Sequence, residues 1–252
     1  MGALQGRVAL VTGSSRGIGA AIATAFANEG AAVAVHGRDV EAINHIVASI
    51  RWEGGRVIPV TGDINRWADI ESMRCRIERE LGPVDLLVAN AGGSPTPPCL
   101  LEDITEVGWR AAIDTNLTGT FLTLKSFLPR MKELQRGTII TISSAAARRP
   151  HAKSPIAYSA AKSGIQMLTQ HLAAQAGPFG IRVNGIAPET ILTERNAERI
   201  PDAVQTMLIG EHPVRRLGTP EDVANAALFL ASEASGWMSG VILDVAGGAV
   251  MT

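Results

Sequence analysis

Residues 138–162 read TIITISSAAARRPHAKSPIAYSAAK, and this stretch decides the fold. Its β-branched start, residues 138–142, predicts a buried strand that ends at the hydroxyls of Ser143 and Ser144. In open parallel sheets, ligands bind beyond the carboxyl ends of the strands. We therefore expect the two serines to face a binding site.

A tyrosine and a lysine follow in the Ala-rich end of the same stretch. Tyr158 and Lys162 are four residues apart, so a helix places them on one face, one turn apart. We expect the ammonium to lower the pKa of Tyr158 from its usual value of about 10. Such a tyrosine can exchange a proton near neutral pH. Taken alone, this spacing more often marks an ordinary helix pair, so its meaning depends on the rest of the chain.

The composition favours one large α/β domain. The chain has 252 residues and a hydrophobic content of 46%, which predicts a single domain over residues 1–252 with a sizeable core. A net charge of −1 gives no field to gather nucleic acid or anionic lipid. No apolar run reaches membrane-spanning length, and Cys75 and Cys99 form neither a disulfide framework nor a metal motif. We expect a soluble, cytoplasmic protein without nucleic-acid, membrane or metal binding.

A glycine-rich turn lies near the N-terminus. It reads GSSRGIG over residues 13–19, between a short buried strand (residues 7–12) and an Ala-rich helix (residues 20–29). Glycines let a diphosphate approach the bare backbone, and the helix N-terminus adds free N–H groups and a positive dipole. This context predicts dinucleotide binding. The contacts expected here are Gly13, Ser15, Arg16, Gly17, Ile18 and Gly19.

The end of the second strand, residues 31–35, bears on the choice of cofactor. An acidic residue there binds the 2′-hydroxyl of NAD, whereas arginine suits the 2′-phosphate of NADP. Gly37 occupies the position expected for the acid, Arg38 follows it, and Arg16 offers a second phosphate contact. We therefore favour NADP(H) over NAD(H). A solvated Arg38 beside Asp39 is the alternative.

Strands and helices alternate along the rest of the chain. Pro59 cannot donate to a ladder, so the third strand, residues 56–60, should lie at a sheet edge, as in the order 3-2-1-4-5-6. Asp63 at its end either accepts from an adenine amino group or caps the next helix. The alternation predicts a Rossmann fold, with a doubly wound seven-stranded parallel sheet in a three-layer α/β/α sandwich.

Two further stretches have features that are not explained by the packing of helices on a sheet. Asn116 lies beside Gly119 within a long helical stretch, residues 102–135, and both are poor helix formers, which indicates a kink or a function. Residues 189–213 are polar and helical, and we interpret them as a lid over the cofactor.

Five motifs occur in a fixed order: TGSSRGIG (12–19), NAG (90–92), Asn116, ISS (142–144) and YSAAK (158–162). Together they resemble the short-chain dehydrogenase/reductase family over essentially the whole chain. The run RLGTPEDVA (216–224) is most similar to the 3-oxoacyl-[acyl-carrier-protein] reductases of that family. The resemblance implies hydride transfer between NAD(P)(H) and a ketone or secondary alcohol, and a homotetramer.

The resemblance also assigns roles to the motif residues. Tyr158 corresponds to the general acid that protonates the carbonyl oxygen, and Ser144 to the residue that orients this oxygen. Lys162 corresponds to the group that lowers the tyrosine pKa and holds the nicotinamide ribose, and Asn116 to the anchor of a water linked to Lys162. Further cofactor contacts implied by the family are Asp63, Ile64, Asn90, Ala91, Gly92, Pro188, Ile191 and Thr193.

Some residues depart from the family pattern on the substrate side. Glu189 stands where the family commonly has a glycine near the nicotinamide, and the interval from Ser144 to Tyr158 is one residue longer than usual. Gln135 and Phe179 stand where carrier-protein reductases tend to place docking arginines. These departures weaken the acyl-carrier assignment without touching the catalytic one.

The lengthened loop between the two motifs carries Arg148, Arg149, His151 and Lys153. Arginine forks suit carboxylates and phosphates, so the loop is one candidate site for an anionic group on the substrate. The alternative, which we favour, is a solvated surface loop.

Our prediction is an NADP(H)-dependent oxidoreductase that acts on a 3-oxoacyl or related carbonyl. One alternative is an NAD-dependent dehydrogenase of a sugar or steroid alcohol. The other is a dinucleotide-binding sensor that has lost catalysis. The intact set of Asn116, Ser144, Tyr158 and Lys162 argues against the sensor, and Glu189 argues for it.

Overall fold

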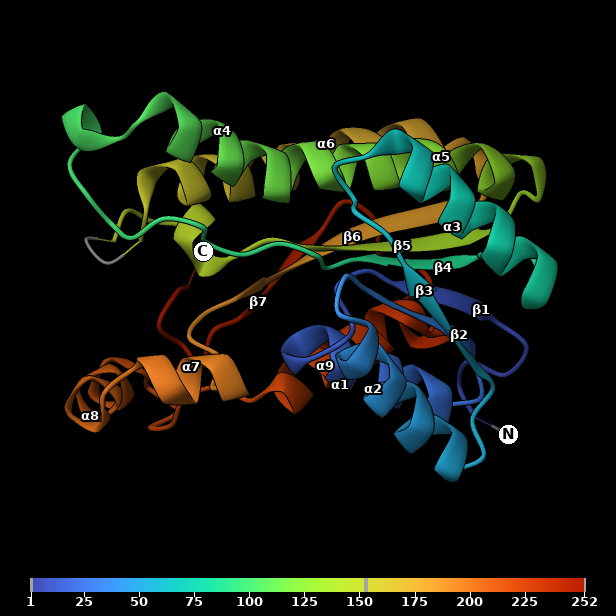
Figure 1. Ribbon diagram of the computed structural model, residues 1–252, viewed down its shortest axis with the longest axis horizontal. Helices are drawn as coiled ribbons and strands as arrows, with labels where there is room; N and C mark the ends of the chain where they lie inside the picture. Colours follow the sequence, from blue (N-terminus) through green and yellow to red (C-terminus); the bar gives the residue numbers. More distant parts are fainter. Residues whose placement is uncertain (1, 152–153, 252) are drawn as a thin grey trace.

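A seven-stranded parallel sheet forms the middle layer of the protein (Figure 1). The computed structural model describes residues 2–151 and 154–251. The strand order β3-β2-β1-β4-β5-β6-β7 confirms the doubly wound Rossmann fold. The strands are β1 (Val8–Val11), β2 (Ala32–Gly37), β3 (Val57–Thr61), β4 (Leu86–Ala89), β5 (Gly137–Ile142), β6 (Ile181–Pro188) and β7 (Ile242–Val245).

Helices cover both faces of this sheet (Figure 1). One face packs against α1 (Gly17–Asn28), α2 (Val40–Trp52) and α9 (Pro220–Ala231). The other face packs against α3 (Trp67–Glu80), α5 (Gly119–Glu133) and α6 (Ile156–Ala176). The remaining helices are α4 (Glu106–Ile113), α7 (Glu194–Arg199) and α8 (Asp202–Glu211), with short 3-10 turns η1 (Leu101–Asp103), η3 (Ala145–Ala147), η4 (Gly177–Phe179) and η5 (Glu233–Ser235).

The strands are apolar on both sides because both sides are covered. In β1, Ala9 and Val11 belong to one core and Leu10 to the other, as the two-residue period of a strand requires. The edge position of β3, predicted from Pro59, is confirmed, since β3 pairs only with β2 in the described sheet.

The stretch 102–135 is not one continuous helix. A π-helical segment, η2 (Asp114–Thr118), separates α4 from α5. Its central residue, Asn116, is fully buried and donates to the carbonyl oxygen of Ala112 at 2.9 Å. The expected interruption at Asn116 is therefore confirmed, and it takes the form of a wide turn that aims the amide into the protein.

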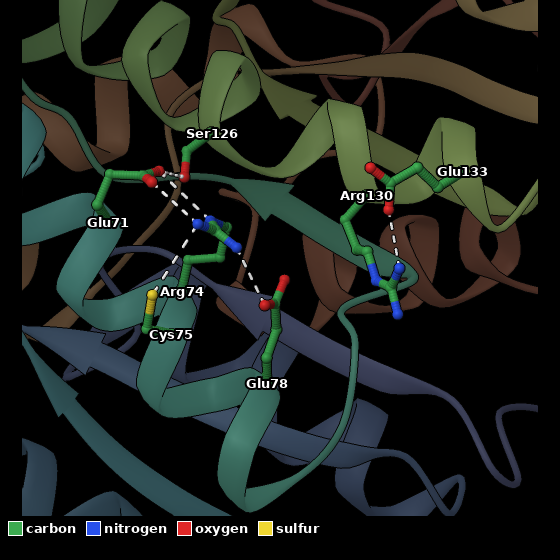
Figure 2. A network of polar contacts seen from close by, with 7 residues as sticks. All are labelled: Glu71, Arg74, Cys75, Glu78, Ser126, Arg130 and Glu133. Carbon is green, nitrogen blue, oxygen red and sulfur yellow. Dashed lines mark hydrogen bonds and ion pairs between the residues drawn. The ribbon is translucent and has the colours of Figure 1, made fainter.

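A polar network on the outside of the sandwich ties α3 to α5 (Figure 2). Arg74 donates to Glu71 at 2.9 Å and to Glu78 at 3.0 Å, one helical turn away on either side. Ser126 on α5 donates to Glu71 at 2.5 Å. This contact fixes α5, whose first residue follows the segment that carries Asn116.

Candidate active site

The carboxyl ends of the strands border one cleft of about 710 Å³. Ser144, Tyr158 and Lys162 line it, together with every cofactor contact predicted from the sequence. Those contacts are Gly13, Ser15, Arg16, Gly17, Ile18, Gly19, Arg38, Asp63, Ile64, Asn90, Ala91, Gly92, Pro188, Ile191 and Thr193. Sequence reasoning did not single out Gly62, Asn65, Thr115, Arg195 and Arg199, which also line the cleft.

The glycine turn after β1 has a backbone conformation that residues with a side chain rarely adopt. Gly13 and Gly17 have φ angles of 65° and 55°, in the left-handed region. A Cβ on Gly19 would collide with the Gly13 carbonyl oxygen. Asn90, at the end of β4, donates to that same oxygen at 3.1 Å. The turn is thus held open at the N-terminus of α1, as a diphosphate site requires.

His36 is a cleft residue that holds the surrounding backbone in place, a role that sequence reasoning did not assign to it. Its Nδ1 accepts from the backbone N–H of Gly13 at 3.0 Å, and its Nε2 lies 3.2 Å from the carbonyl oxygen of Gly62. Burial lowers its pKa to about 4, so the ring is neutral near pH 7. Its position at the end of the second strand, beside Gly37, was the signal available in the sequence.

The end of β2 shows how the adenosine side is charged. A Cβ on Gly37 would lie 3.0 Å from the Ser15 hydroxyl oxygen, which leaves little room for an acidic side chain. Arg16 donates to Asp39 at 2.6 Å, and Asp39 also caps α2 by accepting from the Ala42 N–H. Arg16 thus forms an exposed ion pair with Asp39 at the border of the cleft, and its contact with a cofactor phosphate stays a prediction.

Asp63 does not cap the following helix. The N-cap residue of α3 is Arg66, and Asp63 accepts from the backbone N–H of Asn65 at 2.9 Å in a local turn. The capping alternative is therefore wrong. Its carboxylate lines the cleft, and the adenine contact stays a prediction.

Tyr158, Lys162 and Ser144 meet where β5 faces the first turns of α6. The Lys162 ammonium donates to the carbonyl oxygen of Ile142 at 2.7 Å and lies 5.7 Å from the centre of the Tyr158 ring. The Ser144 and Tyr158 hydroxyls are hydrogen-bonded. The Ser143 hydroxyl points elsewhere, because it donates a hydrogen bond to the Lys162 backbone carbonyl oxygen at 2.9 Å.

The electrostatics around Tyr158 differ from the sequence expectation. Burial raises the pKa of Tyr158, the hydrogen bond with Ser144 opposes the rise, and the Glu189 carboxylate adds to it. Burial also lowers the pKa of Lys162 to about 8. The expectation that Lys162 lowers the tyrosine pKa is therefore wrong for this arrangement, in which the ammonium donates to a backbone carbonyl.

Asn116 lies behind the cleft and is not part of its lining. Its amide donates to the carbonyl oxygen of Gly93 and accepts from the N–H of the same residue, at 2.9 and 3.0 Å. A Cβ on Gly92 would lie 2.6 Å from Asn116 Oδ1 and 3.4 Å from Lys162 Nζ. Asn116 and Lys162 thus flank the Gly92 backbone closely, which only a glycine allows.

The basic loop after β5 divides into two parts. Arg148 forms an ion pair with Asp244 at 2.9 Å and does not line the cleft, so its candidacy as a substrate contact is wrong. Arg149 and His151 do line the cleft. Lys153 lies outside the described residues.

Within residues 2–151 and 154–251, no group of His, Cys, Asp and Glu side chains could hold a metal ion. Over the same ranges, no helix combines the length and the apolar character needed to cross a membrane.

The chain is similar to known proteins over nearly its whole length. A family model described as enoyl-(acyl carrier protein) reductase matches residues 13–250. A 7alpha-hydroxysteroid dehydrogenase of Escherichia coli K12 is 37% identical, over 98% of this chain and 95% of its own. A 3-oxoacyl-[acyl-carrier protein] reductase from Brucella melitensis is 35% identical with a TM-score of 0.94, over 99% of this chain and 93% of that one.

A second solved structure is a 7 alpha-hydroxysteroid dehydrogenase complexed with NADH and 7-oxo glycochenodeoxycholic acid. It is 37% identical to this chain with a TM-score of 0.93, over 99% of this chain and 96% of that one. Both the family model and the relatives cover the glycine turn and the Ser144, Tyr158 and Lys162 cluster. The chain therefore belongs to the short-chain dehydrogenase/reductase family and is an oxidoreductase acting on CH–OH groups.

Proposed function

We propose that this protein interconverts a ketone and a secondary alcohol with NADP(H), and that its substrate is a 3-oxoacyl compound or a related carbonyl. The observation that carries the proposal is the meeting of Ser144, Tyr158 and Lys162 in the same cleft as the glycine turn. Family membership argues against the catalytically inactive sensor.

The chain's own residues supply the proton and hold the reacting oxygen. In the reducing direction, the Tyr158 hydroxyl gives its proton to the substrate carbonyl oxygen, and the Ser144 hydroxyl donates a hydrogen bond to the same oxygen. The reduced nicotinamide, when bound, supplies the hydride. Addition of one hydride to the carbonyl carbon and one proton to the carbonyl oxygen converts the ketone into the secondary alcohol. The oxidising direction is the reverse, with Tyr158 accepting the proton.

Lys162 is suited to return a proton to Tyr158. Its pKa is lowered to about 8 by burial, so its ammonium gives up a proton more readily than an exposed lysine. Asn116 holds the backbone at Gly93 on the other side of Gly92. We assign Asn116 the role of positioning this backbone and a water next to Lys162.

The cofactor has a fitting cradle in the glycine turn, where Gly13 and Gly17 take left-handed φ angles and α1 begins. The preference for NADP(H) is supported by two features at the end of β2. Gly37 leaves little room for the carboxylate that would bind the ribose of NAD. Arg38 is exposed, lines the cleft and has no hydrogen bond or ion pair among the described residues.

The proposed 3-oxoacyl substrate is supported by the similarity to a 3-oxoacyl-[acyl-carrier protein] reductase. The missing docking arginine at Phe179 is partly replaced, because the Lys132 ammonium lies 4.6 Å from the centre of the Phe179 ring. Positive charge is thus present on this surface.

A second candidate is NAD-linked oxidation of a hydroxysteroid or similar alcohol. The relative that was solved with NADH and a 7-oxo steroid acid favours it, and so does the pairing of Arg16 with Asp39, which neutralises one of the two arginines. The two candidates differ in cofactor, so one measurement separates them.

That measurement is a titration of the protein with NADPH and with NADH, followed by nicotinamide fluorescence. Tighter binding of NADPH by about tenfold supports the NADP(H) proposal, and the reverse preference favours the NAD-linked candidate. The catalytic assignment is tested with Tyr158→Phe on a panel of 3-oxoacyl thioesters and ketones. We expect kcat to fall by about 10² to 10⁴, the usual contribution of general acid catalysis, with cofactor affinity retained. A Tyr158→Phe variant with full activity would contradict the assignment.

A further inference from the structure

The arginines of the described residues are almost all engaged with a partner. Most form an ion pair with a carboxylate or donate to a backbone carbonyl, as Arg74, Arg148 and Arg182 do. Among residues 2–151 and 154–251, the arginines without a hydrogen bond or ion pair are Arg38, Arg149, Arg195 and Arg199. All of these line the cleft.

The unpaired arginines fall into two groups along the sheet. Arg38 follows β2, on the side where we place the adenosine end of the cofactor. Arg149 follows β5, which is separated from β2 by β1 and β4 in the sheet. Three strand spacings correspond to about 14 Å, so a single phosphate group does not contact both Arg38 and Arg149. Arg149 therefore needs an explanation other than the cofactor's 2′-phosphate.

Arg195 and Arg199 belong to α7, whose position is set by the glycine turn. Thr193 caps α7, and its Cγ2 would lie 3.2 Å from a Cβ on Gly17. Arg195 reaches across to the loop after β4, where its Nη1 would lie 3.8 Å from a Cβ on Gly93. Residues four apart share one side of a helix, so Arg199 lies on the same side of α7 as Arg195.

The acidic residues of α7 do not neutralise these arginines. Glu194 and Glu198 are also four apart, so they share a different side of the helix, and Glu198 does not line the cleft. Glu194 and Glu189 do line the cleft. Within the described part of the chain, neither forms an ion pair with Arg149, Arg195 or Arg199. In the described residues, the cleft thus holds three guanidinium groups that are not paired with its carboxylates.

We propose that Arg149, Arg195 and Arg199 form a site for an oxyanion, a carboxylate or a phosphate, carried by the substrate at a distance from its reacting carbonyl. The inference rests on the proposed function for the nature of the reaction. Arginine forks bind such oxyanions through paired N–H donors. The substrate class is thus an anionic ketone or secondary alcohol, and α7 contributes to the choice of substrate by charge.

The experiment compares matched charged and neutral substrates at saturating cofactor. One pair is 4-oxocyclohexanecarboxylate and its methyl ester, and a second pair is a hydroxyketone phosphate monoester and the unphosphorylated hydroxyketone. The variants are Arg195→Ala/Arg199→Ala and, separately, Arg149→Ala. The matched control is Arg76→Ala/Arg79→Ala, which removes two arginines from α3 outside the cleft.

We expect the wild type to prefer one charged substrate over its neutral partner by about tenfold or more in kcat/KM, the effect of one charged hydrogen bond. The α7 double variant should lose this preference through a higher KM for the charged substrate, and the α3 control should keep it. Arg195→Lys should keep part of the preference that the double variant loses, because lysine retains the positive charge but lacks the paired N–H donors of the guanidinium group. Preference within the acid pair alone identifies a carboxylate site, and preference within the phosphate pair alone identifies a phosphate site.

Other outcomes would overturn the inference. Equal turnover of charged and neutral substrates by the wild type would overturn the oxyanion site but leave the proposed function intact. A double variant that weakens NADPH binding but keeps the charge preference assigns α7 to the cofactor instead. If no substrate is turned over, the proposed function fails for this panel, and equilibrium binding of the same pairs to the protein decides the inference. Binding of the charged member that disappears in the α7 double variant supports it, and equal or absent binding overturns it.

Discussion

His36 Nδ1 accepts a hydrogen bond from the backbone N–H of Gly13 at 3.0 Å, while its Nε2 lies 3.2 Å from the carbonyl oxygen of Gly62. An imidazole that accepts at Nδ1 carries its proton on Nε2, so the ring is neutral and donates to Gly62. One side chain thus joins the glycine turn after β1 to the loop after β3. The adenosine end of the cleft depends on this neutral ring.

Protonation of His36 should destabilise the fold at acidic pH. Burial lowers its pKa from 6.5 to about 4, so between these values the unfolded chain binds the proton and the folded protein does not. The contribution of His36 is fully present above pH 6.5 and is lost as the pH falls through 4. Its size is about 3 kcal/mol, from the shift in pKa. Urea unfolding at pH 7.5 and at pH 4.5 measures it.

The control for this prediction is His45, which is exposed on α2. His36→Gln should reduce the difference in unfolding free energy between the two pH values, and His45→Gln should leave it unchanged. An unchanged difference in His36→Gln would mean that other groups cause the acid sensitivity.

The pKa of Tyr158 can be measured directly, because it is the only tyrosine in the chain. Burial raises this pKa above the usual value of 10, and Glu189 contributes to the rise. Near-ultraviolet difference absorbance follows the ionisation of this one phenol as the pH increases. A midpoint below that of free tyrosine in the absence of cofactor would contradict the arrangement of Tyr158 and Lys162 described here.

Replacing Glu189 should make Tyr158 more acidic. The carboxylate disfavours the phenolate, so Glu189→Gln should lower the pKa of Tyr158 in the absorbance titration. Alcohol oxidation needs the phenolate as base, and its rate profile should therefore shift to lower pH. Glu194→Gln is the matched control, since Glu194 also lines the cleft but does not act on Tyr158 in the structure. Equal shifts in both variants would point to the general charge of the cleft.

Arg38 should decide between the two cofactors. Arg38→Ala is expected to weaken NADPH binding by about tenfold or more and to spare NADH, since about 1.4 kcal/mol for the 2′-phosphate contact suffices. The Kd values from fluorescence titration test this directly. An equal loss for both cofactors would remove Arg38 from phosphate recognition.

Releasing Arg16 should have the opposite effect. Asp39 holds Arg16 at 2.6 Å and caps α2 with its other carboxylate oxygen. Asp39→Asn keeps a capping oxygen but removes the charge, so Arg16 becomes available to the 2′-phosphate. The ratio of NADPH to NADH affinity should rise in Asp39→Asn. A ratio that stays constant would show that Arg16 does not reach the ribose.

The sequence alone was sufficient for the fold and for Ser144, Tyr158, Lys162 and the expected cofactor contacts at the cleft. Alternating apolar runs and helical segments specify a covered parallel sheet, and Pro59 identifies its edge, because these are local patterns with local physical causes. The glycine turn, the NAG motif and the serines of the ISS motif follow the carboxyl ends of β1, β4 and β5, and a parallel sheet brings those ends together. Ser144, Tyr158 and Lys162 therefore meet as expected.

Only the tertiary structure decided how the charged side chains are partnered. Arg148 pairs with Asp244, far away in the sequence, and does not line the cleft, whereas Arg16 pairs with Asp39 and does line it. Arg195 and Arg199 line the cleft without an ion pair to any of the described residues. The pKa of Tyr158 also depends on burial and on Glu189, which follows β6. Ion pairing and desolvation depend on distances between groups that are remote in the chain, and those distances exist only once the protein has folded.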